Sequence, residues 1–310
     1  MSIEIKEVSY EPWGRCLRLT NGILEAIVTV EYGPRIVSFR LEGGKNTFFE
    51  DSSAEPTVSG PELEERYGKG AAFYRRGGHF SSLAPIRMPE SFFPDNEPVV
   101  YAIKPDGVSL IMLREKTDGL KCMTELLLGD GASDMMVVHS VKNVSHERKR
   151  LSVWSSTALR PGGVEIIPQN GDSGGLAPNR VLAFWPGSAL TDHRLWAGEC
   201  YFTLMQDETA KKPFAMGTNN VTGWAAYVLP EATFIKRYVH DETCFYPHHG
   251  CSFRTRVTSA CAELDSFSPI CIVNPGEGVR HVENLSLFPT RNGVNPTDEA
   301  SVDHFMRSLY

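Results

Sequence analysis

Apolar and polar residues alternate along much of this 310-residue chain, and Gly, Pro and Asn interrupt the alternation at short intervals. The pattern is clearest in the segment 16–51, CLRLTNGILEAIVTVEYGPRIVSFRLEGGKNTFFED, which is broken at 21–22, 33–34 and 43–44. Successive side chains of a strand point to opposite faces, and the breaks carry turn residues. The segment therefore predicts a meander of three antiparallel strands.

The rest of the chain continues with short apolar runs, separated by turn signals such as Pro-Asp-Gly at 105–107 and Gly-Asp-Gly at 129–131. This dense spacing favours an all-β sandwich or barrel over alternating strands and helices. The further strands that we predict span 99–103, 108–115, 122–128, 135–143, 151–158, 183–185, 200–206, 222–229, 232–238, 252–259, 262–267 and 280–288.

Two long segments, 51–97 and 160–180, are predicted to be loops, and loops of this length are usually functional or disordered. The first contains one candidate short helix. The tail predicts a helix with its N-cap at Thr297, which docks on the edge of the sandwich. No internal repeat or linker divides the chain, so we expect one domain over residues 1–310. The apolar stripe of the tail helix is formed by Val302, Phe305, Met306 and Leu309.

Composition narrows the classes of function. Hydrophobic residues make up 41% of the chain and charged residues 22%, which is typical of soluble globular proteins with a large core. The net charge of −7, without clusters of Lys and Arg, argues against a nucleic-acid partner. No phosphate-binding, dinucleotide-binding or GxSxG motif is found, and we expect no cofactor.

The N-terminus and the cysteines suggest a location. The first residues, MSIEIKEVSYEPWG, lack the basic and apolar regions of a signal peptide, and no apolar run is long enough to cross a membrane. The seven cysteines are scattered, odd in number and without a CxxC pair. We therefore expect a cytoplasmic protein with reduced thiols and no membrane partner, present as a monomer or homodimer.

Two acids in the predicted strand 262–267 are the first candidates for chemistry. Glu263 and Asp265 lie two positions apart in CAELDSFSP, so their side chains point to the same face of the strand. That face meets water, or it forms a site.

The segment 73–99, FYRRGGHFSSLAPIRMPESFFPDNEPV, combines aromatic rings with His79, Arg87 and Asp95. This mixture suits a sugar, because rings stack on its C–H face while polar groups bind its hydroxyls. The alternative is a solvated loop with a few docking aromatic residues.

Three more residues have both a structural and a functional interpretation. Arg35 lies on the more apolar face of its strand, where a charge is costly unless it is paired, so it forms a structural ion pair or lines a site. Lys236 alternates with two aromatic residues and lies on an aromatic-lined face or faces solvent. Trp154 is a stacking platform for a sugar or a core residue.

His248 and His249 are adjacent in CFYPHHGCSF. Neighbouring residues of a strand point to opposite faces, and structural zinc sites usually show spacings such as CxxC and HxxxH. We therefore assign no metal site to the sequence. One of the two histidines is a candidate polar residue of a binding site.

Many blocks of the chain, taken together over about residues 15–289, resemble a bacterial family of galactose-mutarotase-like proteins. This resemblance implies a large antiparallel β-supersandwich that binds a carbohydrate in a groove. Aldose 1-epimerases of that superfamily use a strand carboxylate as general base and a His as general acid. The blocks are NGILEAIVTVEYGPRIVSFRLEGGKN, GGH, PDNEPV, LSVWSSTALRPGGVEIIPQ, LAPNRVLAFWP, LTDHRL, GWAAYVLPEATFIKRY, FYPHHGCSFRTRV and AELDSFSPICIVNPGEGVRHVENLSLF.

Matched residue by residue, the resemblance implies particular roles. Asp265 lies nearest to the position of the general base, with Glu263 beside it. His79 in GGH resembles the first His of the mutarotases. The second His has no counterpart, and Trp154 lies in the corresponding region.

Three hypotheses of function follow, beside a structural sandwich whose acids face water. The first is a mutarotase acting on an aldose or an anionic sugar, with Glu263 or Asp265 as base and His79 as acid. The second is a non-catalytic sugar-binding protein. The third is a lyase in which a His or Lys removes a proton from an acidic sugar. The substrate-binding residues that we expect are Arg35, Arg87, Asp95, Trp154, Lys236, His248 and His249.

Overall fold

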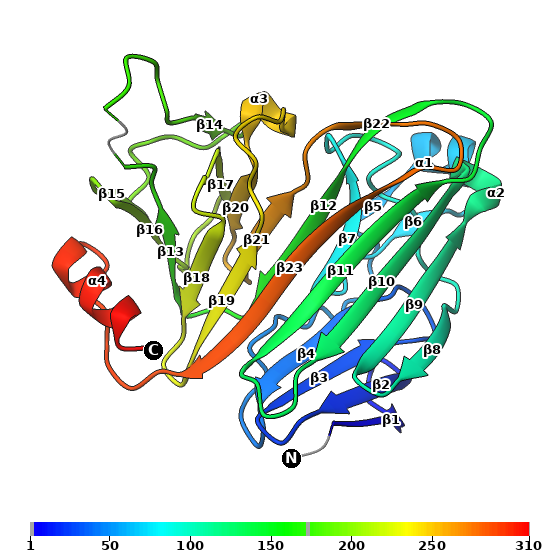
Figure 1. Ribbon diagram of the computed structural model, residues 1–310, viewed down its shortest axis with the longest axis horizontal. Helices are drawn as coiled ribbons and strands as arrows, with labels where there is room; N and C mark the ends of the chain where they lie inside the picture. The colour runs from blue at the N-terminus through cyan, green and yellow to red at the C-terminus, as the bar shows by residue number, and fades with distance from the viewer. Residues whose placement is uncertain (1–2, 172–173, 310) are drawn as a thin grey trace.

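Two large antiparallel β-sheets pack against each other in the computed structural model, which describes residues 3–171 and 174–309 (Figure 1). In the first sheet the strands are, in spatial order, β1 (Glu4–Ser9), β2 (Arg15–Thr20), β3 (Leu24–Thr29), β4 (Ile36–Leu41), β7 (His79–Ala84), β12 (Lys149–Leu159), β21 (Ala262–Phe267), β20 (Phe253–Val257), β17 (Phe214–Thr218) and β14 (Leu182–Phe184), while β22 (Cys271–Val273) pairs with β12.

The second sheet is formed largely by the middle and the end of the chain. Its strands are, in spatial order, β15 (Leu195–Ala197), β16 (Tyr201–Met205), β13 (Val164–Pro168), β18 (Trp224–Val228), β19 (Ala232–Tyr238), β23 (Gly278–Pro289), β11 (Asp134–Asn143), β10 (Leu120–Leu128), β9 (Gly107–Arg114) and β8 (Val100–Lys104).

Burial differs between the two sheets. Residues of β10 in the second sheet alternate between buried and partly exposed, as expected for a strand with one face in the core. In the first sheet, side chains on both faces of β21 and β12 are buried: every residue of β21 is buried, and so is nearly every residue of β12. The inner faces of both sheets enclose the main core. The outer face of the first sheet must therefore have a cover of its own.

That cover is formed by the parts of the segment 51–97 that flank β7, and it contains α1 (Pro61–Tyr67) and the paired β5 and β6 (Val58–Ser59 and Ala72–Phe73). Figure 1 shows these elements beside β7. An apolar cluster joins the cover to the sheet, with Leu63 and Phe73 on one side and Phe80, Trp154 and Phe267 on the other. The predicted short helix is confirmed as α1, but the segment is not a simple loop, because it also contains β7.

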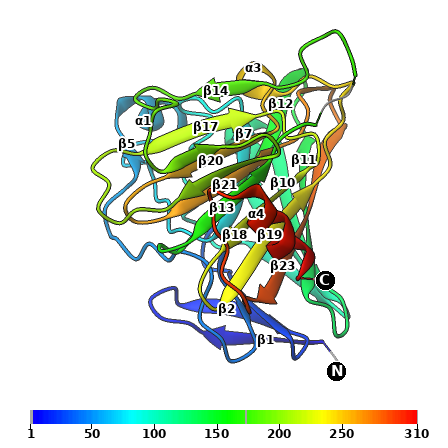
Figure 2. The same ribbon diagram turned by 90° about the vertical axis from the view of Figure 1, so that its left-hand side faces the viewer.

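The tail folds as α4 (Glu299–Arg307) on the outer face of the second sheet, against β13, β18 and β19, and not on the edge of the sandwich as predicted (Figure 2). Its predicted apolar stripe is confirmed, since Val302 and Phe305 are buried there. The predicted cap is wrong by one residue: the side chain of Asp298, and not Thr297, accepts a hydrogen bond from the backbone N–H of Ala300. The other helices are the short α2 (Glu115–Asp118) and α3 (Pro247–Gly250). No helix in the described ranges has the length and apolar character to cross a membrane.

Candidate functional site

A cleft of about 240 Å³ lies on the outer face of the first sheet, between β7, β12, β21 and β20 and the covering segment 51–97. We call it the Trp154 cleft. Its volume is somewhat below the roughly 300–1,000 Å³ of drug-sized ligand sites, which suits a ligand as small as one sugar unit. The sheet contributes Phe80, Trp154, Ser156, Arg254, Arg256 and Glu263 to its lining, and the cover contributes Thr57, Phe73, Arg75, Ile86 and Phe92.

Aromatic rings form one wall of the cleft. The ring of Trp154 packs edge-on against Phe80 and Phe92, with centroids 5.5 and 6.5 Å apart. The indole Nε1 is buried and has no hydrogen-bond partner among the residues that the structure describes. A buried donor without a partner costs about 1–3 kcal/mol. An unpaired indole N–H beside a cleft is therefore a reason to expect a bound acceptor there.

Glu263 lies at the centre of the charged wall. Its Oε1 accepts hydrogen bonds from Arg75 Nη1 at 3.1 Å and from Arg256 Nη1 at 3.2 Å, and its Oε2 is 3.9 Å from Arg254 Nη2. The Nε of Arg75 is buried without a partner in the described part of the chain. Oε2 of Glu263, which none of these guanidinium groups approaches closer than 3.9 Å, thus offers an acceptor to a ligand.

Asp265 lies deeper than Glu263 on the same face. Arg254, which is opposite it on β20, donates from Nε to Asp265 Oδ2 at 2.6 Å. Burial raises the pKa of Asp265, and the neighbouring Arg254 guanidinium opposes that rise. The shared face that the sequence predicts for the two acids is confirmed. Of the two, only Glu263 lines the cleft.

Arg35 and Asp95 lie behind the cleft as a buried ion pair. Arg35 Nη2 is 2.9 Å from Asp95 Oδ2, and Arg35 Nη1 donates to the backbone oxygen of Arg75 at 2.8 Å. Its guanidinium also stacks on Phe80, 4.2 Å from the ring centroid. Burial lowers the pKa of Arg35 and raises that of Asp95. The structural interpretation of Arg35 is the one that the structure shows, and the pair holds Arg75 in position.

The other polar candidates lie at the margin of the cleft or away from it. His248 packs between Trp185 and Phe267, and its Nε2 accepts a hydrogen bond from the backbone N–H of Ile86 at 3.3 Å. Burial, helped by Arg254 and His249, lowers the pKa of His248 to about 4, so the ring is neutral at pH 7. His249 lines a separate surface groove, and the exposed Arg87 pairs with Glu90.

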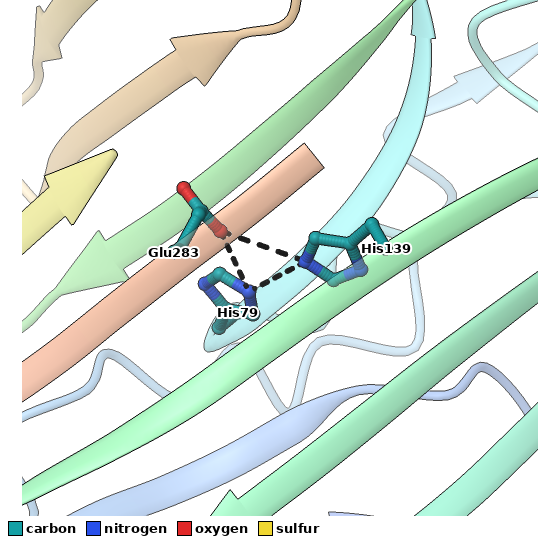
Figure 3. A group of neighbouring side chains, drawn as sticks. All are labelled: His79, His139 and Glu283. Carbon is teal, nitrogen blue, oxygen red and sulfur yellow. Dashed lines mark hydrogen bonds and ion pairs between the residues drawn. The ribbon is translucent and has the colours of Figure 1, made fainter. Parts of the chain in front are cut away.

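His79 and Lys236 lie between the two sheets, on the opposite face of the first sheet from the cleft. His79 Nε2 is 3.0 Å from His139 Nε2 (Figure 3). Lys236 Nζ is 2.9 Å from Glu283 Oε1, and all four residues are almost fully buried. The interpretation in which His79 and an acid of β21 act on one sugar is therefore wrong. In β7, His79 points inward and the next residue, Phe80, points outward.

Several functional candidates were missing from the sequence analysis. Arg254 and Arg256 pair across the β20–β21 hairpin with Asp265 and Glu263. The signal was present in SFRTRV, because opposite charges at i and i+2 on paired strands indicate cross-strand pairs. The inner group of His79, His139 and Glu283 could not be found from local spacing, and its donor atoms lie within 4.8 Å of one another.

No family model and no curated protein matches this sequence. Solved structures do match it in shape. A galactose mutarotase-like protein from Lactobacillus casei ATCC 334 superimposes with a TM-score of 0.56 at 9% identity, over 92% of this chain and 100% of that chain. A galactose mutarotase-like protein from Clostridium acetobutylicum gives a TM-score of 0.53 at 12% identity, over 93% and 99%.

A TPR-domain containing protein from Parabacteroides distasonis ATCC 8503 gives a TM-score of 0.62 at 17% identity. The match covers 91% of this chain but only 48% of that one, so the present chain spans about half the length of that protein. At such low identities these similarities establish the fold alone. The chain has the galactose-mutarotase-like β-sandwich fold, as its sequence predicts.

Proposed function

We propose that this protein binds a carbohydrate in the Trp154 cleft, and that the preferred ligand is a neutral aldose unit. The observation that carries the proposal is the buried indole N–H of Trp154, which lies without a partner in the described structure beside an aromatic and charged cleft. An aromatic wall with nearby donors and acceptors is suited to a pyranose ring and its hydroxyls. The likeness in fold to mutarotase-like proteins supports the same class of ligand.

The charge balance of the cleft favours a neutral sugar over a uronate or a sugar phosphate. Arg75 pairs with Asp51 and Glu263, Arg256 pairs with Glu263, and Arg254 pairs with Asp265. Three guanidinium groups therefore face three carboxylates. An anionic ligand would have to compete with these carboxylates for the same N–H groups.

Mutarotation is the second candidate, because Glu263 is a carboxylate that lines the cleft and could take the anomeric proton. The acid could not be His79, which lies between the sheets. His248 lies beside the cleft, in contact with the lining residue Ile86, but its pKa of about 4 leaves it without the proton that a general acid must donate at pH 7. Mutarotation therefore ranks below binding alone. A lyase acting through His79 or Lys236 is not supported by this arrangement, since both lie on the inner side of the sheet.

The proposal is tested by NMR on a panel of neutral aldoses, uronates and sugar phosphates. Saturation-transfer signals report binding, and exchange cross-peaks between the α and β anomers report mutarotation. We expect neutral aldoses to bind, and Trp154→Phe, which keeps an aromatic ring but removes the N–H, to weaken binding about tenfold. We expect Glu263→Gln to abolish any enzyme-dependent exchange.

The matched control is Arg87→Gln. Arg87 is exposed and outside the cleft, so this variant should bind like the wild type, whereas Arg256→Gln should bind more weakly. Binding of anionic sugars only would overturn the preference for a neutral ligand. Equal binding by wild type and Trp154→Phe would remove the cleft as the site.

A further inference from the structure

Three donor atoms from distant parts of the chain converge between the two sheets (Figure 3). Nε2 of His79 is 3.0 Å from Nε2 of His139 and 3.4 Å from Oε2 of Glu283, and the distance between His139 Nε2 and Glu283 Oε2 is 3.6 Å. His79 comes from β7 in the first sheet, and the other two come from β11 and β23 in the second. The group therefore joins the sheets at one point.

These separations fit the ligand shell of a small divalent ion. Bonds of about 2.0–2.1 Å at tetrahedral angles place donor atoms about 3.3–3.4 Å apart. Ser155 Oγ lies on a fourth side, 3.5 Å from each Nε2 atom and 2.5 Å from Glu283 Oε2. Two imidazole nitrogens with one carboxylate oxygen are a common donor set for Zn²⁺.

The outer contacts of the three residues direct these donor atoms inward. Nδ1 of His79 is 2.9 Å from Thr157 Oγ1, and Nδ1 of His139 is 3.0 Å from Thr124 Oγ1. A hydroxyl that accepts Nδ1–H leaves the lone pair of Nε2 free for a metal, as in zinc sites generally. The other oxygen of Glu283 is held by Lys236.

We propose that His79, His139 and Glu283 bind Zn²⁺ in the interior of the sandwich, with Ser155 on the fourth side. The ion is structural, because the donors are 0–1% exposed and lie on the opposite face of the first sheet from the Trp154 cleft. This inference is independent of the proposed sugar site.

Lys236 sets the strength of the site. Its ammonium group already neutralises Glu283, so Zn²⁺ and Lys236 share one carboxylate in a buried environment. Lys236→Met should leave that carboxylate to the ion. We therefore expect this variant to bind Zn²⁺ at least about tenfold more tightly than the wild type.

The experiment measures the metal content of the full chain, expressed in medium supplemented with zinc, by elemental analysis. We expect close to one Zn²⁺ per chain, and Co²⁺ in its place should give the visible absorption of a tetrahedral site. His139→Gln should lose the ion. His240→Gln is the matched control, since His240 stacks on Tyr246 away from the group and should leave the metal content unchanged.

The proposal is overturned if the wild-type protein contains almost no metal and the Lys236→Met variant binds none either. Metal that His139→Gln retains would overturn it equally, because the ion would then lie elsewhere. If His139→Gln does not fold, unfolding of the wild type keeps the test decisive, because Zn²⁺ that binds only the folded state should raise the free energy of unfolding, and no rise would contradict the proposal.

Discussion

Glu165 on β13 is a buried carboxyl group that the sequence did not single out. Thr255 donates to its Oε2 at 2.5 Å, and its Oε1 has no partner among the described residues. Burial, assisted by the charge of Asp265, raises the pKa of Glu165 to about 8. The group is therefore mostly protonated at neutral pH in the folded protein, whereas the unfolded chain ionises it near its ordinary pKa of about 4.3.

The sign of the pH dependence follows. Well below pH 4, Glu165 is protonated in both the folded and the unfolded state and has no effect on the pH dependence of stability. As the pH rises from about 4.3 to about 8, only the unfolded state loses the proton, and the free energy of unfolding falls by up to about 1.4 kcal/mol per pH unit. Glu165→Gln should remove this part of the slope and make the protein more stable at pH 8. Urea unfolding at several pH values measures it. An unchanged slope, equal to that of the exposed control Glu208→Gln, would contradict the prediction.

Arg35 and Lys236, for which the sequence left a structural and a functional interpretation open, show what a sequence pattern cannot predict. The unusual charge on an apolar face at Arg35 was visible in the sequence, and a structural ion pair was one of its two explanations. Its partner, Asp95, lies 60 residues away and was expected to bind substrate. Lys236 was also recognised as unusual, but its partner Glu283 lies on another strand of the second sheet. Alternation tells which residues share a face, but not what lies opposite that face.

At the scale of elements, regular alternation was predicted best. The meander 16–51 is confirmed as β2, β3 and β4, and the strand 262–267 as β21. β7 and β13 were missed because they lie in 51–97 and 160–180, where Gly, Pro and polar residues favour loops. Missing β7 had a consequence for the site: as part of a loop His79 could have pointed anywhere, but as a strand residue next to the outward-facing Phe80 it points into the interior.

β12 separates the two proposed sites, and its adjacent serines test that separation. Ser156 lines the Trp154 cleft, whereas Ser155 donates to Glu283 Oε2 between the sheets at 2.5 Å. Ser156→Ala should weaken sugar binding a few-fold and leave stability nearly unchanged. Ser155→Ala should cost about 1–3 kcal/mol of unfolding free energy, because it removes a hydrogen bond to a buried carboxylate, and should leave sugar affinity unchanged.

Parallel measurements of sugar affinity and urea unfolding on both variants decide the matter. If Ser155→Ala changed sugar affinity as much as Ser156→Ala, the two faces of β12 would not act independently. The two substitutions remove the same atoms one position apart, so each variant is the control for the other.

At the scale of the whole molecule, a polar network crosses the apolar core that holds the sheets together. Lys236 Nζ in the second sheet donates to the backbone oxygens of Ser155 and Leu264 in the first sheet, each at 3.1 Å, and pairs with Glu283. A buried pair of this kind stabilises a fold weakly compared with apolar residues of the same size. Removing one partner is costly, because it leaves the other charge buried and unpaired.

This asymmetry predicts the outcome of a double-mutant cycle, measured by urea unfolding with a chelator present so that metal binding does not contribute. Lys236→Met and Glu283→Met should each lower the free energy of unfolding by about 3–5 kcal/mol, and the double variant should lose less than either single one. If the two losses simply added, the charges would not be coupled, and the network would stabilise the sandwich through separate hydrogen bonds to each sheet. If the double variant is nearly as stable as the wild type, the contacts of the apolar core suffice to hold the two sheets together without the Lys236–Glu283 pair.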